Sequence, residues 1–529
     1  MNLIPHKKKE TFRMLFKQIG GVQIILGFIL FIPMIVSIIY GEYYSALGFF
    51  VSSIIILFIG YALFKFNDPV PEPLSRHALI IAALGWMSIA IMGSIPFMIT
   101  AYITPPDILN QFIPSGAEYT SSLQFFKNPL HALFESMSAF TTTGLTMAVH
   151  EPSIGKGLIF YRSLAQWIGG AGFIVLSIAV FRQSSGRAAM LLYGSESSGE
   201  RLQPTIIDTS RSIWKIYLGL TLFSTLFLII GTYFILPDYS FKENIFDSIN
   251  HAMTGQSTGG FSTLDDSIAG YNSKAMEMLY LFPMILGALS IPFYFKVIYE
   301  KQFNQFWKNI QTRSVLLFSI IGGIILSFLL LKSGFETEPF RKGIFQFVSA
   351  LTTTGWQTAD INGWDSSSVV FIVMGAMIVG GAAGATVGGI KIIRVLLILK
   401  GVQWHINGYF VSDNAVQVVE FNQKRLLPEE MNKELASAAT FSFIYLLLVL
   451  ISTLITYYYM GDGYTITEAL FESASAQGTV GLSCGITGPS MSPVLELTYF
   501  FQMWIGRLEI IPVLVLLRTI IWGTKPKVV

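Results

Sequence analysis

Four short polar stretches, rich in threonine and glycine, interrupt an otherwise apolar sequence. They lie at residues 141–144, 257–260, 352–355 and 478–481. Glycine permits backbone conformations that turn successive carbonyl groups to one side, and a threonine hydroxyl can help to hold such a loop. One such stretch alone would be read as a turn between helices. Four in the same register predict loops that face a common axis and replace the water around a monovalent cation with carbonyl oxygens.

The composition places the chain in a lipid bilayer. Of its 529 residues, 52% are hydrophobic and only 12% are charged, whereas soluble domains carry about 25% charged residues. The net charge of +2 argues against nucleic acid as a partner, because nucleic-acid binding usually needs a dense basic surface. The single cysteine, Cys484, excludes an internal disulfide bond.

The apolar segments are arranged as a hairpin followed by a repeated unit. Two runs at residues 22–40 and 46–64 can each cross about 30 Å of hydrocarbon, which predicts a helical hairpin. Each later unit has an outer helix, a short amphipathic helix that ends in a Thr/Gly stretch, and a closing helix. The predicted outer and closing helices are 78–99 and 158–181, 213–236 and 276–298, 314–331 and a segment from 369, and 436–460 and 495–517.

We therefore predict an all-α polytopic membrane protein, with four fused helix–pore loop–helix units around a pseudo-fourfold pore. The predicted divisions are the hairpin at 1–73 and pore units at 74–200, 201–305, 306–425 and 426–529. If ten spans are drawn, the basic residues fall mainly on one side, which we expect to be cytoplasmic together with the N-terminus. This basic set includes Lys7, Lys8, Lys9, Arg76, Arg182, Arg187, Arg201, Arg211, Lys391, Arg394 and Lys400.

The short helices before the four stretches align by residue type. Phe134, Phe345 and Phe471 stand at the same distance before their glycines, and Phe246 lies one helical turn further back. Capping-box patterns begin two of these helices, at Ser240 with Glu243 and at Thr465 with Glu468. Because the C-terminal carbonyls of a helix carry partial negative charge, each short helix would favour a cation at its loop.

Several longer motifs show a family resemblance that covers nearly the whole chain. They are FESMSAFTTTG at 134–144, GGFST at 259–263, GIKIIR at 389–394 and GRLE at 506–509. These motifs resemble the Trk/Ktr/HKT superfamily of cation transporters, most closely the membrane subunit of bacterial Trk potassium uptake systems.

The resemblance implies which residues hold the ion. Their carbonyls would form a selectivity filter for K⁺. All four loops keep their glycine. In relatives, a serine in place of the glycine of the first loop accompanies Na⁺ entry. The implied residues are Thr142, Thr143, Gly144, Thr258, Gly259, Gly260, Thr353, Thr354, Gly355, Thr479, Val480 and Gly481.

A second glycine-rich segment breaks the closing helix of the third unit. Irregular backbone at membrane depth is tolerated only beside protein or a water-filled cavity. The resemblance implies a gating loop formed by Gly380, Gly381, Gly384, Thr386, Gly388 and Gly389. Arg507 lies within the last apolar helix, where a charge needs a partner. It could pair with Glu509 or with carbonyls of this segment, and we expect its charge to act as a barrier that helps to hold the loop closed.

The predicted function is K⁺ uptake across the bacterial inner membrane, with no cofactor in this chain. The resemblance implies a homodimer and a cytoplasmic nucleotide-binding regulatory subunit of the TrkA type, for which the basic segments 182–211 and 400–433 are candidate contact surfaces. The alternative is a secondary transporter of another solute, with broken helices at mid-membrane. An enzyme is not predicted, because the six histidines show no metal-ligand spacing and no catalytic constellation is evident. His251 is interpreted as a packing or capping residue.

Overall fold

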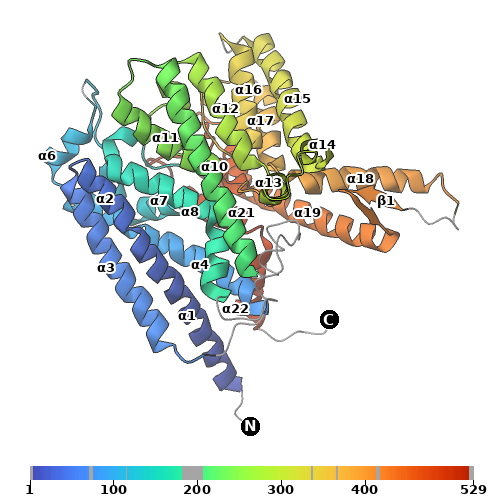
Figure 1. Ribbon diagram of the computed structural model, residues 1–529, viewed down its shortest axis with the longest axis horizontal. Helices are drawn as coiled ribbons and strands as arrows, with labels where there is room; N and C mark the ends of the chain where they lie inside the picture. Colours follow the sequence, from blue (N-terminus) through green and yellow to red (C-terminus); the bar gives the residue numbers. More distant parts are fainter. Residues whose placement is uncertain are drawn as a thin grey trace.

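The computed structural model describes residues 4–70, 75–114, 116–181, 206–334, 337–364, 367–412 and 418–523. Long helices dominate these residues (Figure 1). The only sheet in the described part is a two-stranded antiparallel hairpin of β1 (Val419–Phe421) and β2 (Lys424–Leu426). The predicted all-α class is therefore confirmed, apart from this small hairpin. Of the predicted basic set, Lys7, Lys8, Lys9, Arg76, Arg182, Arg187 and Arg201 have side chains outside the described residues.

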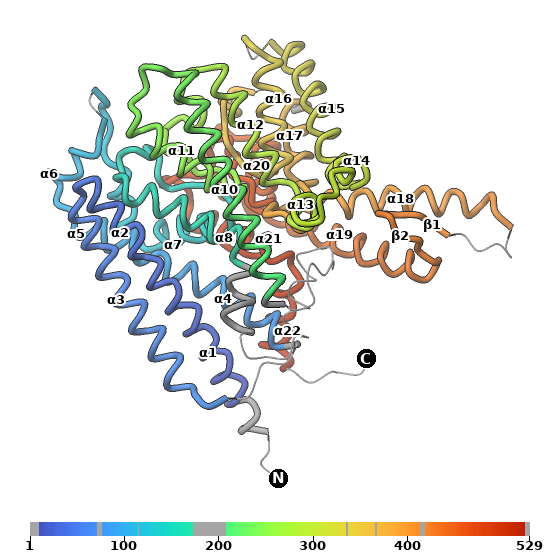
Figure 2. The backbone as a smooth tube through the Cα atoms, viewed as in Figure 1, coloured from blue at the N-terminus to red at the C-terminus, as the bar shows by residue number. Residues whose placement is uncertain are grey.

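The N-terminal hairpin consists of α1 (Ile4–Ile29), α2 (Phe31–Ile39) and α3 (Tyr43–Phe66). Helices α1 and α3 lie side by side along one flank of the molecule (Figure 2). They approach closely at two glycines, because a Cβ on Gly20 would lie 2.6 Å from Phe64 N and 2.7 Å from Gly60 O. Small residues at such a crossing let two helices pack tightly. In a bilayer this packing stabilises the pair, because lipid tails are as apolar as the side chains and the hydrophobic effect does not bring the helices together.

Each of the four units has the predicted order of outer helix, short helix and closing helix. The outer helices are α4 (Ser75–Gly93) with α5 (Ile95–Ile103), α10 (Ile206–Ile235), α15 (Ile310–Ser333) and α19 (Pro428–Tyr459). The short helices are α7 (Pro129–Phe140), α11 (Phe241–Gln256), α16 (Pro339–Leu351) and α20 (Ile466–Gly478). The closing helices are α8 (Lys156–Phe181), α12 (Lys274–Ala288) with α13 (Ile291–Ile298), α17 (Ser367–Val379) with α18 (Ile392–Gly408), and α21 (Pro493–Arg507) with α22 (Ile511–Trp522).

Smaller elements connect these helices. They are α6 (Pro106–Leu109), η1 (Asn110–Phe112), η2 (Ser122–Lys127), η3 (Glu151–Ile154), η4 (Ser267–Tyr271), α14 (Gln305–Lys308) and η5 (Ile361–Gly363).

Two closing helices predicted as single segments, 276–298 and 495–517, are each bent at a break. Helices α12 and α13 meet at 94°, and α21 and α22 meet at 111°. At the first bend, Ser290 caps α13 and Pro292 occupies its first turn. At the second, Glu509 and Ile510 adopt positive φ values of 55° and 66°. Hydropathy does not reveal either bend, because apolar residues continue on both sides of the break.

Six further helices in the described part are long and apolar enough to cross a membrane. Outer helices α10, α15 and α19 expose many large apolar side chains, including Leu222, Ile320 and Leu454. The short helices, in contrast, are buried along most of their length. This arrangement suits a protein whose outer surface contacts lipid and whose polar loops lie inside the bundle.

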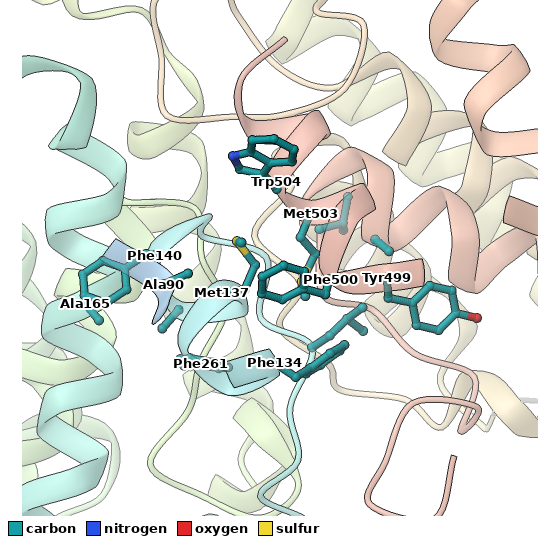
Figure 3. Packing of buried hydrophobic residues seen from close by; sticks show 14 of the residues in the cluster. Ala90, Phe134, Met137, Phe140, Ala165, Phe261, Tyr499, Phe500, Met503 and Trp504 are labelled. Atoms are coloured by element: carbon teal, nitrogen blue, oxygen red, sulfur yellow. The ribbon is translucent and has the colours of Figure 1, made fainter. Parts of the chain in front are cut away.

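The largest apolar core includes the contact between the first and fourth units. Phe134 and Met137 of α7 lie beside Phe500 and Met503 of α21 (Figure 3). His131 of α7 adds a polar contact, at 2.8 Å between its Nδ1 and Glu496 Oε1 of α21. The first and last units therefore pack together, which closes the circle of four units.

The capping predictions have mixed outcomes. Thr465 forms the predicted capping box, since its N–H donates to the Glu468 carboxylate. Ser240 makes no side-chain cap, so that prediction is wrong. Its proposed partner Glu243 instead forms an ion pair with Lys156 at the start of α8. A long-range ion pair has displaced a local one, which the sequence alone does not show.

A further hairpin was not predicted. Helix α18, β1, β2 and the beginning of α19 project together from the bundle (Figure 1). Its contacts are apolar, with Leu397, Val419 and Met431 buried between the two helices.

Candidate functional site

The four Thr/Gly loops each contain three residues that follow a short helix, here called the first, second and third positions. Loop 1 is Thr142, Thr143 and Gly144; loop 2 is Thr258, Gly259 and Gly260; loop 3 is Thr353, Thr354 and Gly355; loop 4 is Thr479, Val480 and Gly481. These are the twelve ion-binding residues predicted above, and all lie in the described part of the structure.

The same hydrogen bonds end all four short helices. In each loop, the N–H of the second position donates to a carbonyl five residues earlier, as in a Schellman motif. The bonds are Thr143 N to Ser138 O at 2.9 Å, Gly259 N to Thr254 O at 2.8 Å, Thr354 N to Ser349 O at 3.0 Å, and Val480 N to Ser475 O at 3.0 Å. The loops are thus four copies of one local structure.

The backbone handedness alternates in the same way in every loop. The first-position threonines have φ values of 56°, 51°, 52° and 48°, and the third-position glycines have 92°, 79°, 84° and 92°. The residue between them keeps a negative φ. Threonine is β-branched and rarely adopts positive φ, at a cost of about 1–3 kcal/mol for each residue. Four strained threonines at equivalent places point to a functional constraint.

The loops meet in a closed ring. A Cβ added to Gly144 would clash with Gly259 O of loop 2, and one on Gly260 would clash with Thr354 O of loop 3. In the same manner Gly355 faces Val480 O of loop 4, and Gly481 faces Thr143 O of loop 1. Each loop therefore contacts the next through a second-position carbonyl and a third-position glycine. Only glycine fits, because the neighbouring carbonyl occupies the place of a side chain.

A set of tether residues holds the chain where it leaves each loop. Each tether lies nine residues before the third-position glycine of its loop. Its side chain accepts a hydrogen bond from the N–H of the residue three positions after that glycine. The bonds are Met147 N to Glu135 at 2.8 Å, Thr263 N to His251 Nε2 at 3.4 Å, Thr358 N to Gln346 at 3.0 Å, and Cys484 N to Glu472 at 3.1 Å. All four tethers are fully buried.

Sequence analysis did not identify these tethers, although their fixed spacing from the glycines was available. The differing residue types concealed the pattern. His251 is a tether and not only a packing residue, and it corresponds in position to Glu135. Glu135 also accepts a bond from Arg162 Nε at 2.7 Å, so a buried ion pair supports loop 1.

The glycine-rich segment, residues 380–389, lies against the first positions of the loops. The hydroxyl of Thr386 is 3.1 Å from that of Thr258, and Gly388 N–H donates to Thr353 Oγ1 at 3.2 Å. A Cβ on Gly388 would clash with Gly478 O, just before loop 4. The predicted segment therefore contacts three of the four loops, at the ends of the short helices.

Arg507 is buried and reaches the same segment. Its guanidinium donates to Thr386 O, to Gly169 O at 2.8 Å and to Gly170 O at 3.1 Å. Two pairings were predicted for Arg507, with Glu509 or with carbonyls of the glycine-rich segment. The structure shows the second, through Thr386 O. Glu509 accepts hydrogen bonds from Lys391 and Arg394, which tie the end of the segment to the bend between α21 and α22.

The ring offers neutral oxygen ligands. Its backbone carbonyls and threonine hydroxyls carry no formal charge, and the buried hydroxyls of Thr142 and Thr479 have no hydrogen-bond partner among the described residues. Divalent cations usually require carboxylates, and the described residues contain no cluster of His, Cys, Asp or Glu that could hold a metal ion. Such a ring suits a monovalent cation that binds weakly enough to leave again.

Comparisons with known proteins show the family of this chain. A family model described as TrkH, cation transport protein, matches residues 94–522. An uncharacterized cation transporter of Methanocaldococcus jannaschii is 32% identical over 507 residues, which is 96% of this chain and 95% of that protein. The Trk system potassium uptake protein TrkH of Escherichia coli is 27% identical and covers 97% of this chain and 99% of its own.

A solved structure has the same fold. The crystal structure of the potassium transporter TrkH from Vibrio parahaemolyticus superposes with a TM-score of 0.78 at 25% identity, and covers 97% of this chain and 99% of its own. The chain is accordingly a multi-pass membrane transporter and not an enzyme. With a family model that matches most of its length, the chain belongs to the TrkH family of cation transport proteins.

Proposed function

We propose that this protein takes up K⁺ across the cell's inner membrane through the ring of four loops, which serves as its selectivity filter. The observation that carries the proposal is the closed ring itself, in which each second-position carbonyl packs on the next loop's glycine. The names of the relatives, which are potassium uptake proteins, favour K⁺ among the monovalent cations. An inside-negative potential would contribute about 2.3 kcal/mol per charge for every 100 mV.

The glycine-rich segment and Arg507 form the gate in this proposal. The segment hydrogen-bonds to first-position threonines in loops 2 and 3, so it stands where an ion leaving the ring would pass. Arg507 fixes the segment through the Thr386 carbonyl and places a positive charge beside it. A buried guanidinium repels a cation strongly because little water screens it. These contacts support the assignment of the segment and Arg507 as a barrier below the ring.

The finer features of assembly complete the proposal. The N-terminus is cytoplasmic, the protein is a homodimer, and a nucleotide-binding regulatory subunit binds the cytoplasmic surface. Of the two candidate contact segments, residues 182–205 lie outside the described part, whereas Lys400 lies on the projecting hairpin. Purification from the native host should recover a complex with such a subunit.

Ion uptake into liposomes tests the function. Purified protein should let K⁺ and Rb⁺ into liposomes under an inside-negative potential, and excess Na⁺ should compete poorly. Empty liposomes provide the control. Uptake of an organic solute without cation flux would contradict the proposal and would favour a secondary transporter of another solute.

A further inference from the structure

Loop 2 differs from the other loops at its second position. Glycine stands at residue 259, whereas loops 1, 3 and 4 have Thr143, Thr354 and Val480. The backbone does not require glycine there, because Gly259 keeps a negative φ, as its three equivalents do. Another feature must explain the missing side chain.

In the other loops, the second-position side chain helps to hold the loop. Thr143 Oγ1 lies 2.8 Å from Thr141 Oγ1, and Thr354 Oγ1 lies 2.9 Å from Thr352 Oγ1. Val480 has no hydroxyl, but it is fully buried in the apolar core. Gly259 can make neither kind of contact, so loop 2 needs support from elsewhere.

Gln166 of α8 occupies the place of the missing side chain. A Cβ on Gly259 would lie 2.6 Å from Gln166 Oε1 and 2.9 Å from its Nε2. The Gln166 Nε2 group donates to Gly259 O at 2.5 Å, and its Oε1 accepts the N–H of Phe261 at 3.1 Å. The side chain is fully buried. One amide from the first unit thus clamps the backbone on both sides of Gly260.

We propose that Gln166 is a positioning residue for ion selectivity, because it sets the orientation of the Gly259 carbonyl in the ring. This inference rests on the proposed function of the ring as a filter. The equivalent carbonyls of Thr143, Thr354 and Val480 accept no side-chain hydrogen bond from the residues that the structure describes. Three of the four second-position carbonyls in the ring are therefore similar. The fourth, that of Gly259, accepts a hydrogen bond from the Gln166 amide.

Two sets of variants test this role. Gln166→Glu keeps an acceptor for Phe261 N–H, and its ionised carboxylate has no donor for Gly259 O. In the second set, Gly259→Thr alone should clash with Gln166, and Gln166→Ala alone should leave Gly259 without support. The double variant Gln166→Ala/Gly259→Thr rebuilds the arrangement of loop 1, since Ser257 stands two residues earlier, as Thr141 does before Thr143.

Gln502 provides the matched control. It is also a buried glutamine on a closing helix, but it contacts Ser452 and Ser473 instead of a loop. Each variant should be reconstituted in liposomes, with Rb⁺ uptake measured against Na⁺ uptake and the melting temperature measured in detergent. The ratio of the two uptakes is the readout that a purely structural role would not change.

We expect Gln166→Glu to lower the Rb⁺/Na⁺ uptake ratio by about five- to tenfold, as loss of one hydrogen bond predicts, while Gln502→Glu leaves the ratio unchanged. The double variant should recover selectivity relative to both of its single variants. An unchanged ratio in folded Gln166→Glu, or no recovery in the folded double variant, would overturn the role of Gln166 alone. Absence of K⁺ and Rb⁺ uptake by the unmodified protein would overturn the proposed function and this inference together.

Discussion

At the scale of single residues, Arg507 combines two effects that can be separated. Its forked guanidinium binds carbonyls from two different segments, and its charge lies next to the glycine-rich segment. A buried arginine in a membrane is costly unless it is well paired. Lysine would keep the charge, but a point-like ammonium cannot reproduce the planar set of donors.

Replacement of Arg507 distinguishes these effects. Arg507→Ala should raise basal K⁺ flux in liposomes, since both the charge and the contact with Thr386 O are lost. Arg507→Lys should stay close to the unmodified flux if the charge is the main barrier, and should approach the alanine variant if the hydrogen bonds dominate. Unchanged flux in Arg507→Ala would refute the gating role.

At the scale of elements, the glycine-rich segment shows how close packing replaces side chains. Gly388 lies against Gly478 O and Thr479 Oγ1, so its Cα touches the end of α20. Gly375, on α17 thirteen residues before Gly388, has no atom of the described residues within 4 Å of an added Cβ. The two glycines in one short region therefore have opposite tolerance to a methyl group.

Alanine substitution at these glycines tests whether the segment blocks the ring. Gly388→Ala should push the segment away from α20 and raise the basal K⁺ flux measured in liposomes. Gly375→Ala should leave the flux unchanged and stabilise α17 by about 0.5–1 kcal/mol, because alanine favours a helix. A flux in Gly388→Ala equal to that of the control would place the barrier elsewhere.

At the scale of the whole molecule, one carboxylate adds a polar link to the contacts between the N-terminal hairpin and the first unit. Glu42, in the turn between α2 and α3, accepts hydrogen bonds from Lys156 N at 2.5 Å and Gly157 N at 2.9 Å. It thus caps α8 from a distant part of the chain. Gly157 also packs on Ser37 of the hairpin. The hairpin therefore supports the helix that carries Gln166 without itself contributing to the ring.

Loss of this cap should affect stability more than selectivity. Glu42→Ala leaves two N–H groups without their acceptor, and we expect a loss of about 1–2 kcal/mol, typical for removal of a cap. Thermal melting in detergent measures the effect, and Glu10→Ala, on the exposed surface of α1, is the control. The Rb⁺/Na⁺ uptake ratio should stay the same. A changed ratio without a change in melting temperature would show that the hairpin acts on the ring directly.

Much of the architecture could be predicted from local patterns. The Thr/Gly stretches, the phenylalanines at fixed spacing and the apolar runs identify four similar units, because each unit needs the same short helix to end in the same turn. Residue identity also located the glycine-rich segment and Arg507. The bends at Ser290 and Glu509 were missed, since apolar residues lie on both sides of each bend.

What the sequence determined by itself is the repetition: four copies of one helix-ending turn, within helices apolar enough for a membrane. What only the tertiary structure decided is which groups complete each copy. The tether His251 takes the place of a carboxylate, and Gln166 takes the place of a side chain at Gly259, from a helix in another unit. These partners are separated along the chain, so their pairing depends on the closed ring, in which hydrogen-bonding groups buried away from water must find one another.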